Sequence, residues 1–406
     1  MEWNNGPDPF KAIEAILKRF RVDRQPGLPP FLGGAIGFVS YDAKDLIESK
    51  LCGDGKAPSI FPKVYFDFFD EGIVLDHTQT CAFLFAGRAA RLRDLESLFK
   101  KTSGVSRSAD CADGSKKIRG DARPCLGRSE FVELVRRAKR YIRKGEVYQA
   151  NISQRFELDL SGDALSIYER LRQVNPSPFF GFLDAGHFQI VSGSPERLLK
   201  LEGGWLETRP IAGTRARGSD EAEDRRLSLD LLLNEKERAE HIMLVDLERN
   251  DLGKVCEPGS VAVDELMTLE HYSHVKHIVS NIRGKLAKDK GAVDAFKAFF
   301  PGGTITGVPK VRCMQILDEL EPVARGPYTG SLGYLSFTGD MDFNILIRSL
   351  FVKGRKAYLQ TGAWIVADSV PSKEYDETLH KAEGIFTAVF GGKKTRSIFS
   401  RCRASA

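Results

Sequence analysis

The stretch NEKERAEHIMLVDLERND, residues 234–251, places acidic side chains on an otherwise apolar helical face. Glu237 and Glu240 are three residues apart, so both project from the same side of a helix. That side also carries Leu233 and Leu244. Because a carboxylate within an apolar stripe needs a partner, the stretch predicts a helix that presents two acids to a site.

A second stretch, SKEYDETLHKAEGIF at residues 372–386, repeats this arrangement with Glu374 and Glu377. Two helices with such pairs could supply the hard oxygen ligands that Mg²⁺ prefers and leave positions open for water and an anionic substrate. On spacing alone, solvated helices are the simpler interpretation, with Glu377 and Lys381 forming an i,i+4 ion pair. The magnesium interpretation therefore needs support from the rest of the chain.

Helices and strands are expected in blocks along the chain. The hydrophobic spacing predicts helices over residues 8–20, 129–145, 221–248 and 372–389. Strands are predicted over 63–69, 72–75 and 80–86, with strand-rich blocks over 151–217 and 328–367. Such blocks, in place of a regular βαβ alternation, favour an α+β fold.

One polar segment indicates how the chain is divided. Residues 103–125 are small and polar and contain almost no large hydrophobic side chain, which is typical of a linker or surface loop. We therefore expect an N-terminal lobe over 1–102, a main region over 126–392 that contains both acidic helices, and a basic tail over 393–406.

Composition excludes several classes of protein. The 406 residues are 42% hydrophobic and 28% charged, as in globular proteins, and a net charge of +5 gives no support for nucleic-acid binding. Seven cysteines without a CxxC pair are not a disulfide framework and favour a reducing cytoplasm. The sequence contains no export signal and no run of ~18 apolar residues that could span a membrane.

Taken together, the motifs resemble those of the chorismate-utilising enzymes over about residues 128–390. The shared stretches include GEVYQANISQR (145–155), SPERLLK (194–200), RPIAGTRARG (209–218), FPGGTITGVPK (300–310) and YDETLHKA (375–382), besides the first helix quoted above. The sequences of these motifs most resemble those of the aminodeoxychorismate synthase component I branch, and next those of anthranilate synthase component I. The resemblance implies an α+β fold of two large antiparallel β-sheets packed face to face, with surrounding helices.

The resemblance also implies roles for the acidic residues. Glu240 and Glu377 match Mg²⁺ ligands, and Glu237 and Glu374 lie beside them as further acids. Glu196, in the motif SPE, matches the acid that protonates the hydroxyl leaving C4 of chorismate. A carboxyl group among anions has its pKa raised, which suits a general acid.

Further residues match positions that contact the substrate. Arg348 and Tyr334 match residues that hold the pyruvyl carboxylate, a task that suits the guanidinium fork. Thr304 and His277 match positions that line the ring site, and Lys310 matches an anion contact. Gly362 belongs to a motif that donates backbone N–H groups to the pyruvyl carboxylate.

Three positions bear on the choice of branch. Branches that add water to chorismate carry a lysine base at the position of Gln149, and glutamine cannot deprotonate water, which favours ammonia as the nucleophile. Aminodeoxychorismate synthases carry a lysine at the position of Ala212, in the motif PIKGT, whereas anthranilate synthases have the motif PIAGT, as this chain does. Trp364 replaces a glycine of the backbone-donor motif and adds bulk there.

The expected function is Mg²⁺-dependent amination of chorismate to 4-amino-4-deoxychorismate, in the folate pathway. Anthranilate synthase component I is the alternative, and Ala212 with Trp364 also leaves open a chorismate-binding protein with impaired catalysis. The amine-adding branches receive ammonia from a separate class I glutamine amidotransferase. This chain lacks the G-x-C-x-G elbow of such a glutaminase, so we expect the partner to be another chain and expect no nucleic acid or membrane partner.

Overall fold

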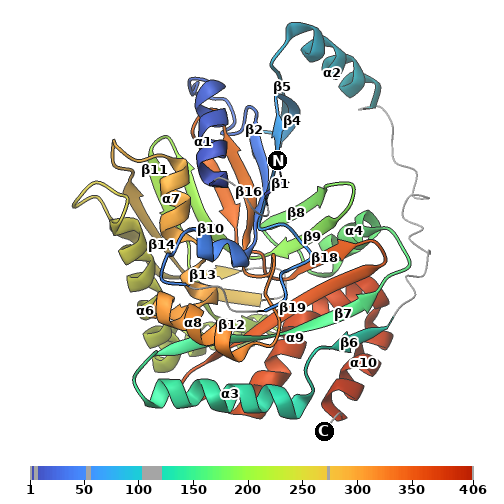
Figure 1. Ribbon diagram of the computed structural model, residues 1–406, viewed down its shortest axis with the longest axis vertical. Coiled ribbons are helices and arrows are strands. Elements are labelled where there is room, and N and C mark those ends of the chain that lie inside the picture. The colour runs from blue at the N-terminus through green and yellow to red at the C-terminus, as the bar shows by residue number, and fades with distance from the viewer. Residues whose placement is uncertain (1, 4–7, 52–55, 103–120, 272–274, 405–406) are drawn as a thin grey trace.

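Two large antiparallel β-sheets form the body of the protein, as a computed structural model shows for residues 2–3, 8–51, 56–102, 121–271 and 275–404 (Figure 1). The ten-stranded sheet has the order β1 (Glu2–Trp3), β3 (Val64–Phe69), β2 (Gly34–Val39), β16 (Ser331–Ser336), β17 (Met341–Asn344), β10 (Arg197–Glu202), β11 (Trp205–Thr208), β14 (Val275–Lys285) and β12 (Ile211–Ala216), and β13 (Ala262–His271) also pairs with β14. The seven-stranded sheet has the order β15 (Gly307–Val308), β7 (Gln149–Asp159), β19 (Lys356–Ile365), β18 (Ser349–Lys353), β9 (Gln189–Ser194) and β8 (Phe179–Asp184), with β6 (Ala122–Pro124) on β7.

The two sheets pack against each other through aromatic and aliphatic side chains. Phe38 and Leu332 of the ten-stranded sheet share one buried cluster with Ile190 and Phe351 of the seven-stranded sheet. Successive residues of a strand point to opposite faces, so strands such as β2 and β18 have one face in this cluster and the other under helices. The predicted α+β fold of two packed antiparallel sheets is confirmed.

Among the described helices, those that share the apolar cluster of the seven-stranded sheet are α3 (Arg128–Arg143), α4 (Ala164–Val174), α8 (Lys310–Leu320), α9 (Pro371–Phe390) and α10 (Gly392–Ala404). Phe156 of β7 is fully buried against Phe386 of α9, and their rings meet edge to face with centroids 5.4 Å apart. Helix α9 packs against β19 of this sheet, and the acids Glu374 and Glu377 lie in its first two turns.

The ten-stranded sheet is covered by α1 (Pro9–Arg19), α6 (Glu235–Gly253) and α7 (Ala292–Phe299), which share a second apolar cluster with its strands. The single helix predicted over 221–248 is two helices, α5 (Glu221–Leu233) and α6. Asn234 separates them because its side-chain oxygen accepts a hydrogen bond from the backbone N–H of Glu237 and so begins a new helix. Helix α8 follows the short strand β15.

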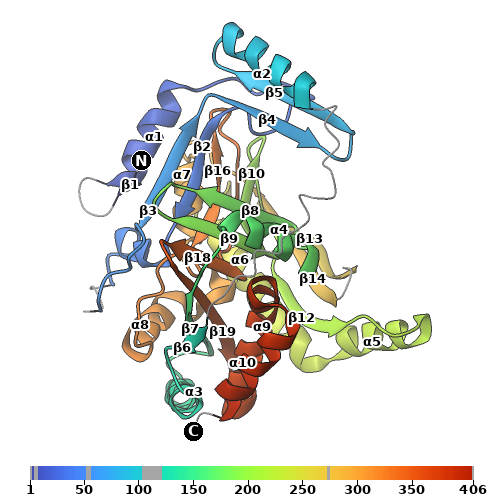
Figure 2. The ribbon, with the colours of Figure 1, turned by 90° about the vertical axis from the view of Figure 1, so that its right-hand side faces the viewer.

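The range 1–102, expected as an N-terminal lobe, contributes to two places. Strands β1 to β3 belong to the ten-stranded sheet, whereas β4 (Glu71–Asp76), β5 (Cys81–Ala86) and α2 (Ala89–Thr102) form a projecting arm (Figure 2). Of the expected linker, residues 103–120 lie outside the described residues, and β6 joins the seven-stranded sheet. The expected basic tail, 393–406, forms most of α10, which buries Ile398 and Phe399.

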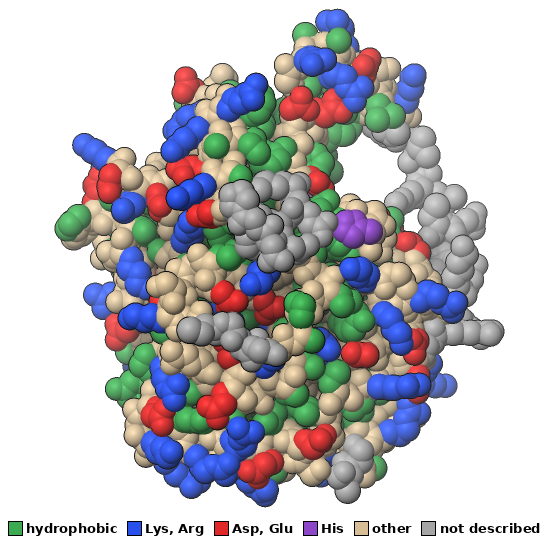
Figure 3. All heavy atoms as spheres, in the orientation of Figure 1, with side chains coloured by type: hydrophobic (Ala, Val, Ile, Leu, Met, Phe, Trp, Pro, Cys, Tyr) green, Lys and Arg blue, Asp and Glu red, His purple; other side chains and the backbone are tan. Residues whose placement is uncertain are grey.

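Surface charge follows the mixed composition of the sequence. On the face drawn in Figure 3, basic and acidic side chains alternate, and apolar side chains are scattered among them. Among the described helices, none is both long and apolar enough to cross a membrane.

Candidate active site

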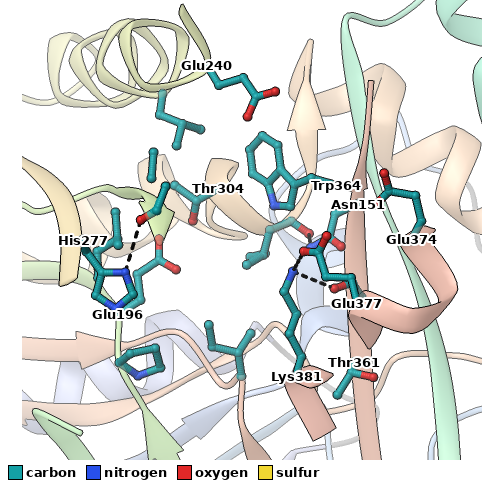
Figure 4. Close-up of a pocket in the computed structure, with 18 of the residues that line it drawn as sticks. Asn151, Glu196, Glu240, His277, Thr304, Thr361, Trp364, Glu374, Glu377 and Lys381 are labelled. Carbon is teal, nitrogen blue, oxygen red and sulfur yellow. Dashed lines mark hydrogen bonds and ion pairs between the residues drawn. The ribbon is translucent and has the colours of Figure 1, made fainter. Parts of the chain in front are cut away.

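A pocket of about 470 Å³ collects most of the residues that the sequence motifs singled out (Figure 4). Its walls come from both sheets and from helices α6 and α9. The expected site residues that line it are Glu196, Ala212, Glu237, Glu240, His277, Thr304, Arg348, Gly362, Glu374 and Glu377. Residues nearly 200 positions apart in the sequence therefore meet in one place.

Local chain geometry brings α6 against the pocket. Gly213 adopts a φ of +59°, and a β-carbon there would lie 2.7 Å from Leu231 and 2.9 Å from Glu237. Only glycine accommodates both the left-handed backbone and this close approach, so the turn after Ala212 can pass directly beside the first turn of α6.

Glu196 is the most strongly perturbed acid of the pocket. It follows strand β9, is 7% exposed, and its backbone carbonyl accepts a hydrogen bond from the N–H of Ile345 at 3.0 Å. Burial raises the pKa of this carboxyl to about 7, although the Thr304 hydroxyl and the Lys381 ammonium oppose the shift. A carboxyl group that titrates near neutral pH can both donate and accept a proton during a reaction.

The four acids of α6 and α9 face one another across the pocket. Burial raises the pKa values of Glu240 and Glu374, and the negative charge of Glu377 adds to both shifts. Glu237 is paired with Arg215 at 3.2 Å, and Glu377 with Lys381 at 2.7 Å. Mutually repelling carboxylates that are half withdrawn from water form a site that a cation would stabilise.

Carboxylates are suitable ligands for a hard divalent cation. The present positions of these four acids, however, are not suitable for binding one ion together. Within the described part of the chain, no three His, Cys, Asp or Glu side chains converge closely enough to hold a metal ion. Figure 4 shows Glu240 on one side of the pocket and Glu374 and Glu377 on the other, with the Trp364 indole between them. The side chains would have to approach one another to coordinate one ion.

Cationic groups lie in the same pocket. Arg348 is half-buried, with a φ of +51°, and lines the pocket. Burial lowers its pKa, but a guanidinium keeps its charge at any pH of interest. Lys381, besides its ion pair with Glu377, donates a hydrogen bond to the carbonyl of Gly362 at 2.9 Å. These two cations would attract an anionic substrate.

His277 and Thr304 complete the wall next to Glu196. Burial lowers the pKa of His277, so its imidazole is neutral near pH 7. One ring nitrogen, Nδ1, lies 3.3 Å from the carbonyl of Gly213. The hydrogen bond with Gly213 holds this neutral imidazole in a fixed orientation in the pocket wall.

Three expected site residues do not line the pocket. Tyr334, on β16, packs edge to face on Phe31 with centroids 5.1 Å apart. Lys310 bonds Asp251 at 2.5 Å and the carbonyl of Phe299 at 3.0 Å, so its charge is already neutralised. Neither side chain lines this pocket, and their expected contacts with substrate stay predictions.

Gln149 is the third of these residues. It is fully buried at the start of β7 and pairs with Val308 of β15. The pocket reaches β7 only at Asn151, two residues further along the same strand face. The Gln149 side chain therefore lies on the strand face of Asn151 without lining the pocket, and its expected place beside the nucleophile stays a prediction.

Several lining residues were not anticipated from the sequence: Asn151, Lys236, Tyr328, Gln360 and Lys381. Tyr328 takes the place expected for Tyr334, because it is the tyrosine of this segment that reaches the pocket beside Arg348. From the sequence, Lys381 was expected only to form a surface ion pair with Glu377. The pairing is correct, but it lies in the pocket.

Comparisons with known proteins place this site in a family. The family model described as "chorismate binding enzyme" matches residues 4–387. Aminodeoxychorismate synthase component 1 of Bacillus subtilis is 44% identical over 384 residues, covering 92% of this chain and 81% of the relative. Anthranilate synthase component 1 of Acetivibrio thermocellus is 40% identical over 396 residues, covering 94% of this chain and 80% of the relative.

A solved structure gives the same result. The crystal structure of anthranilate synthase component I from Streptococcus pneumoniae superposes with a TM-score of 0.84 at 34% identity, covering 95% of this chain and 89% of that one. The chain belongs to the chorismate-binding enzyme family and is an enzyme of the anthranilate synthase and aminodeoxychorismate synthase component I type.

Proposed function

We propose that this protein aminates chorismate at C4 to give 4-amino-4-deoxychorismate, as an aminodeoxychorismate synthase component I of the folate pathway. The observation that carries the proposal is Glu196, a buried carboxyl whose pKa of about 7 leaves about half of it protonated at pH 7. A leaving hydroxyl needs such an acid. The 44% identity to the B. subtilis aminodeoxychorismate synthase component 1 supports reaction at C4.

In the proposed reaction, the nitrogen of ammonia forms a bond to C4 while the bond between C4 and its hydroxyl oxygen breaks. Glu196 protonates the departing hydroxyl, which leaves as water. The Glu196 carboxylate then takes the surplus proton from the new nitrogen, so the acid is restored. His277 and Thr304 line the pocket beside Glu196 and would orient the ring toward it.

The two carboxylates of chorismate need separate partners. Arg348, with the Tyr328 hydroxyl in the same wall, would bind the pyruvyl carboxylate through its guanidinium fork. Glu240 and Glu377, with Glu237 and Glu374 beside them, would hold a Mg²⁺ ion whose charge offsets the ring carboxylate when it is bound.

Anthranilate synthase component I remains the second candidate because of Ala212, which lines the pocket with a methyl group where a lysine would be expected. Ammonia itself must then be the first nucleophile, either directly at C4 or at C2. Mass spectrometry of quenched enzyme should show no covalent chorismate adduct at position 212. An adduct on another side chain of the wild-type protein would contradict direct attack by ammonia.

We also propose that a separate class I glutamine amidotransferase supplies the ammonia and that both proteins work in the cytoplasm. The support comes from the family and from the cysteine content of the sequence. A pull-down with a glutaminase subunit, followed by glutamine-dependent turnover, tests this proposal. Turnover that depends only on added ammonium would contradict it.

The activity can be tested with the chain alone. Chorismate, ammonium chloride and Mg²⁺ are incubated with wild-type protein, Glu196→Gln and Glu133→Gln, a control on the exposed face of α3. We expect ammonium-dependent loss of chorismate with wild type and the control, and a rate lower by about 10²–10⁴ with Glu196→Gln. Stable chorismate with wild type, or an active Glu196→Gln, would contradict the proposal.

A further inference from the structure

Two amide side chains of the pocket wall each have a buried oxygen atom without a hydrogen-bond partner among the described residues. The first is Asn151 of β7, which is 4% exposed. Its Nδ2 donates to the carbonyl of Ile305 at 3.1 Å. Because a carbonyl can only accept, this bond fixes the amide orientation and turns Oδ1 toward the pocket. No described residue bonds this Oδ1.

The position of the Asn151 oxygen is set by Gly362 on the neighbouring strand β19. A β-carbon at Gly362 would lie 2.4 Å from Asn151 Oδ1 and 2.9 Å from the Tyr328 hydroxyl oxygen. The glycine therefore leaves space on the pocket wall at the point where the free oxygen stands.

The second amide is Gln360, two residues before Gly362 on the same strand face and 2% exposed. Its Nε2 donates to Ser153 Oγ at 2.8 Å. Ser153 Oγ gives its own proton to Glu321 at 2.7 Å, so toward Gln360 it can only accept. Gln360 Oε1 is therefore the free end, and it too has no partner among the described residues.

A buried ion pair holds both amides in place. Arg325 binds both carboxylate oxygens of Glu321, at 2.7 and 2.8 Å, and this carboxylate anchors Ser153. Arg325 also donates to the carbonyl of Ile305 at 3.2 Å, the same carbonyl that orients Asn151. A buried acceptor without a donor is costly, and here two are fixed in one pocket, which indicates a ligand rich in N–H donors.

We infer that Asn151 and Gln360 form the subsite that holds ammonia while it attacks the substrate. This inference rests on the proposed amination. Ammonia has three N–H donors and one lone pair. Two amide oxygens can accept two of these donors without taking a proton, so the lone pair stays free to attack carbon. A carboxylate at this place would instead favour the ammonium ion, which has no lone pair.

The test uses ammonium chloride as the nitrogen source, without a partner protein, and measures the KM for ammonia. Asn151→Leu and Gln360→Met keep the side-chain size but remove the oxygen acceptor. We expect each to raise the KM for ammonia about 5- to 10-fold, the worth of one hydrogen bond, and both together to raise it further. The KM for chorismate and kcat at saturating ammonia should stay within about 2-fold.

Gln154→Met is the matched control. Gln154 is a buried amide on the same strand as Asn151, its Nε2 donates to Thr378 Oγ1 at 2.5 Å, and it faces the helix layer on the other side of the sheet. Its loss should leave the KM for ammonia unchanged. Circular dichroism checks folding, and Asn151→Ala and Gln360→Ala replace any variant that does not fold.

Each outcome has a distinct meaning. An unchanged KM for ammonia in both active-site variants overturns the inference and leaves the proposed amination intact. A rise in the KM for chorismate alone also overturns it, because the amides would then contact chorismate or only bound water. If the wild-type protein does not aminate chorismate at all, the proposed function fails and the ammonia subsite fails with it.

Discussion

Replacing Glu196 by glutamine should stabilise the folded protein at alkaline pH while abolishing turnover. Burial raises the pKa of Glu196 from its ordinary value of 4.5 to about 7. At about 1.4 kcal/mol per pH unit, this difference corresponds to about 3 kcal/mol that the fold loses when the buried carboxyl ionises. Glutamine has nearly the same shape and never ionises, so it does not incur this cost.

The direction of the pH dependence follows from linkage. The pKa is higher in the folded than in the unfolded protein, so the contribution of Glu196 to stability is fully present below about pH 4.5 and is lost as the pH rises through about 7. The stability of Glu196→Gln relative to wild type should therefore increase by about 3 kcal/mol between pH 4.5 and pH 8. Turnover by wild type should fall over the upper part of this range as the acid loses its proton.

Urea unfolding of both proteins at pH 4.5 and pH 8 measures this change, with Glu133→Gln as an exposed control. The control should differ from wild type by less than about 0.5 kcal/mol at both pH values. The reasoning is refuted if Glu196→Gln gains no stability over wild type between the two pH values, because Glu196 would then ionise in the fold as readily as in water.

Three further predictions concern the same pocket. Glu240→Gln or Glu377→Gln should abolish turnover and the heat of Mg²⁺ binding in calorimetry without changing the circular dichroism spectrum, and substantial activity at saturating Mg²⁺ would count against their role. Arg348→Met should raise the KM for chorismate about 10- to 100-fold with a small change in kcat, because a charge-assisted contact is lost, and an unaltered KM would show that Arg348 does not bind the substrate. Trp364→Gly should increase kcat/KM for chorismate, since it removes bulk between the two acidic helices, and an unchanged or lower value would mean that the indole contributes to binding.

The acidic helices show what sequence reasoning can predict. An i,i+3 pair on a helix fixes a shared face, so Glu237 with Glu240, and Glu374 with Glu377, were predictable as pairs. That the two pairs meet in one pocket depends on how α6 packs on one sheet and α9 on the other. Periodicity carries no such information, and only the family resemblance brought the helices together.

The two tyrosines show where the sequence was insufficient. Tyr334 and Tyr328 are six residues apart in one segment, and a motif does not reveal which side chain faces the pocket. Tyr328 lies before β16 and lines the pocket, whereas Tyr334 lies within the strand and packs on Phe31. Because Tyr328 lies outside β16, the alternation of side chains along that strand does not show where the Tyr328 side chain lies.

Lys310 and Asn151 show the same limit for buried polar groups. A lysine after a glycine-rich turn suggested an anion contact, but Asp251 of α6, 59 residues earlier, already neutralises it. No sequence pattern marks Asn151 as a site residue. Its role depends on the hydrogen bond from its Nδ2 to the carbonyl of Ile305, which leaves Oδ1 without a partner among the described residues. Such partners come from tertiary packing and leave no local pattern.

The product formed from chorismate, ammonium and Mg²⁺ tests the central claim most directly. Mass spectrometry of the reaction, with and without a lyase that releases 4-aminobenzoate, distinguishes the two candidate activities. We predict 4-amino-4-deoxychorismate from the chain alone and 4-aminobenzoate plus pyruvate once the lyase is added. Anthranilate and pyruvate from the chain alone, with no 4-amino product, would contradict the proposal.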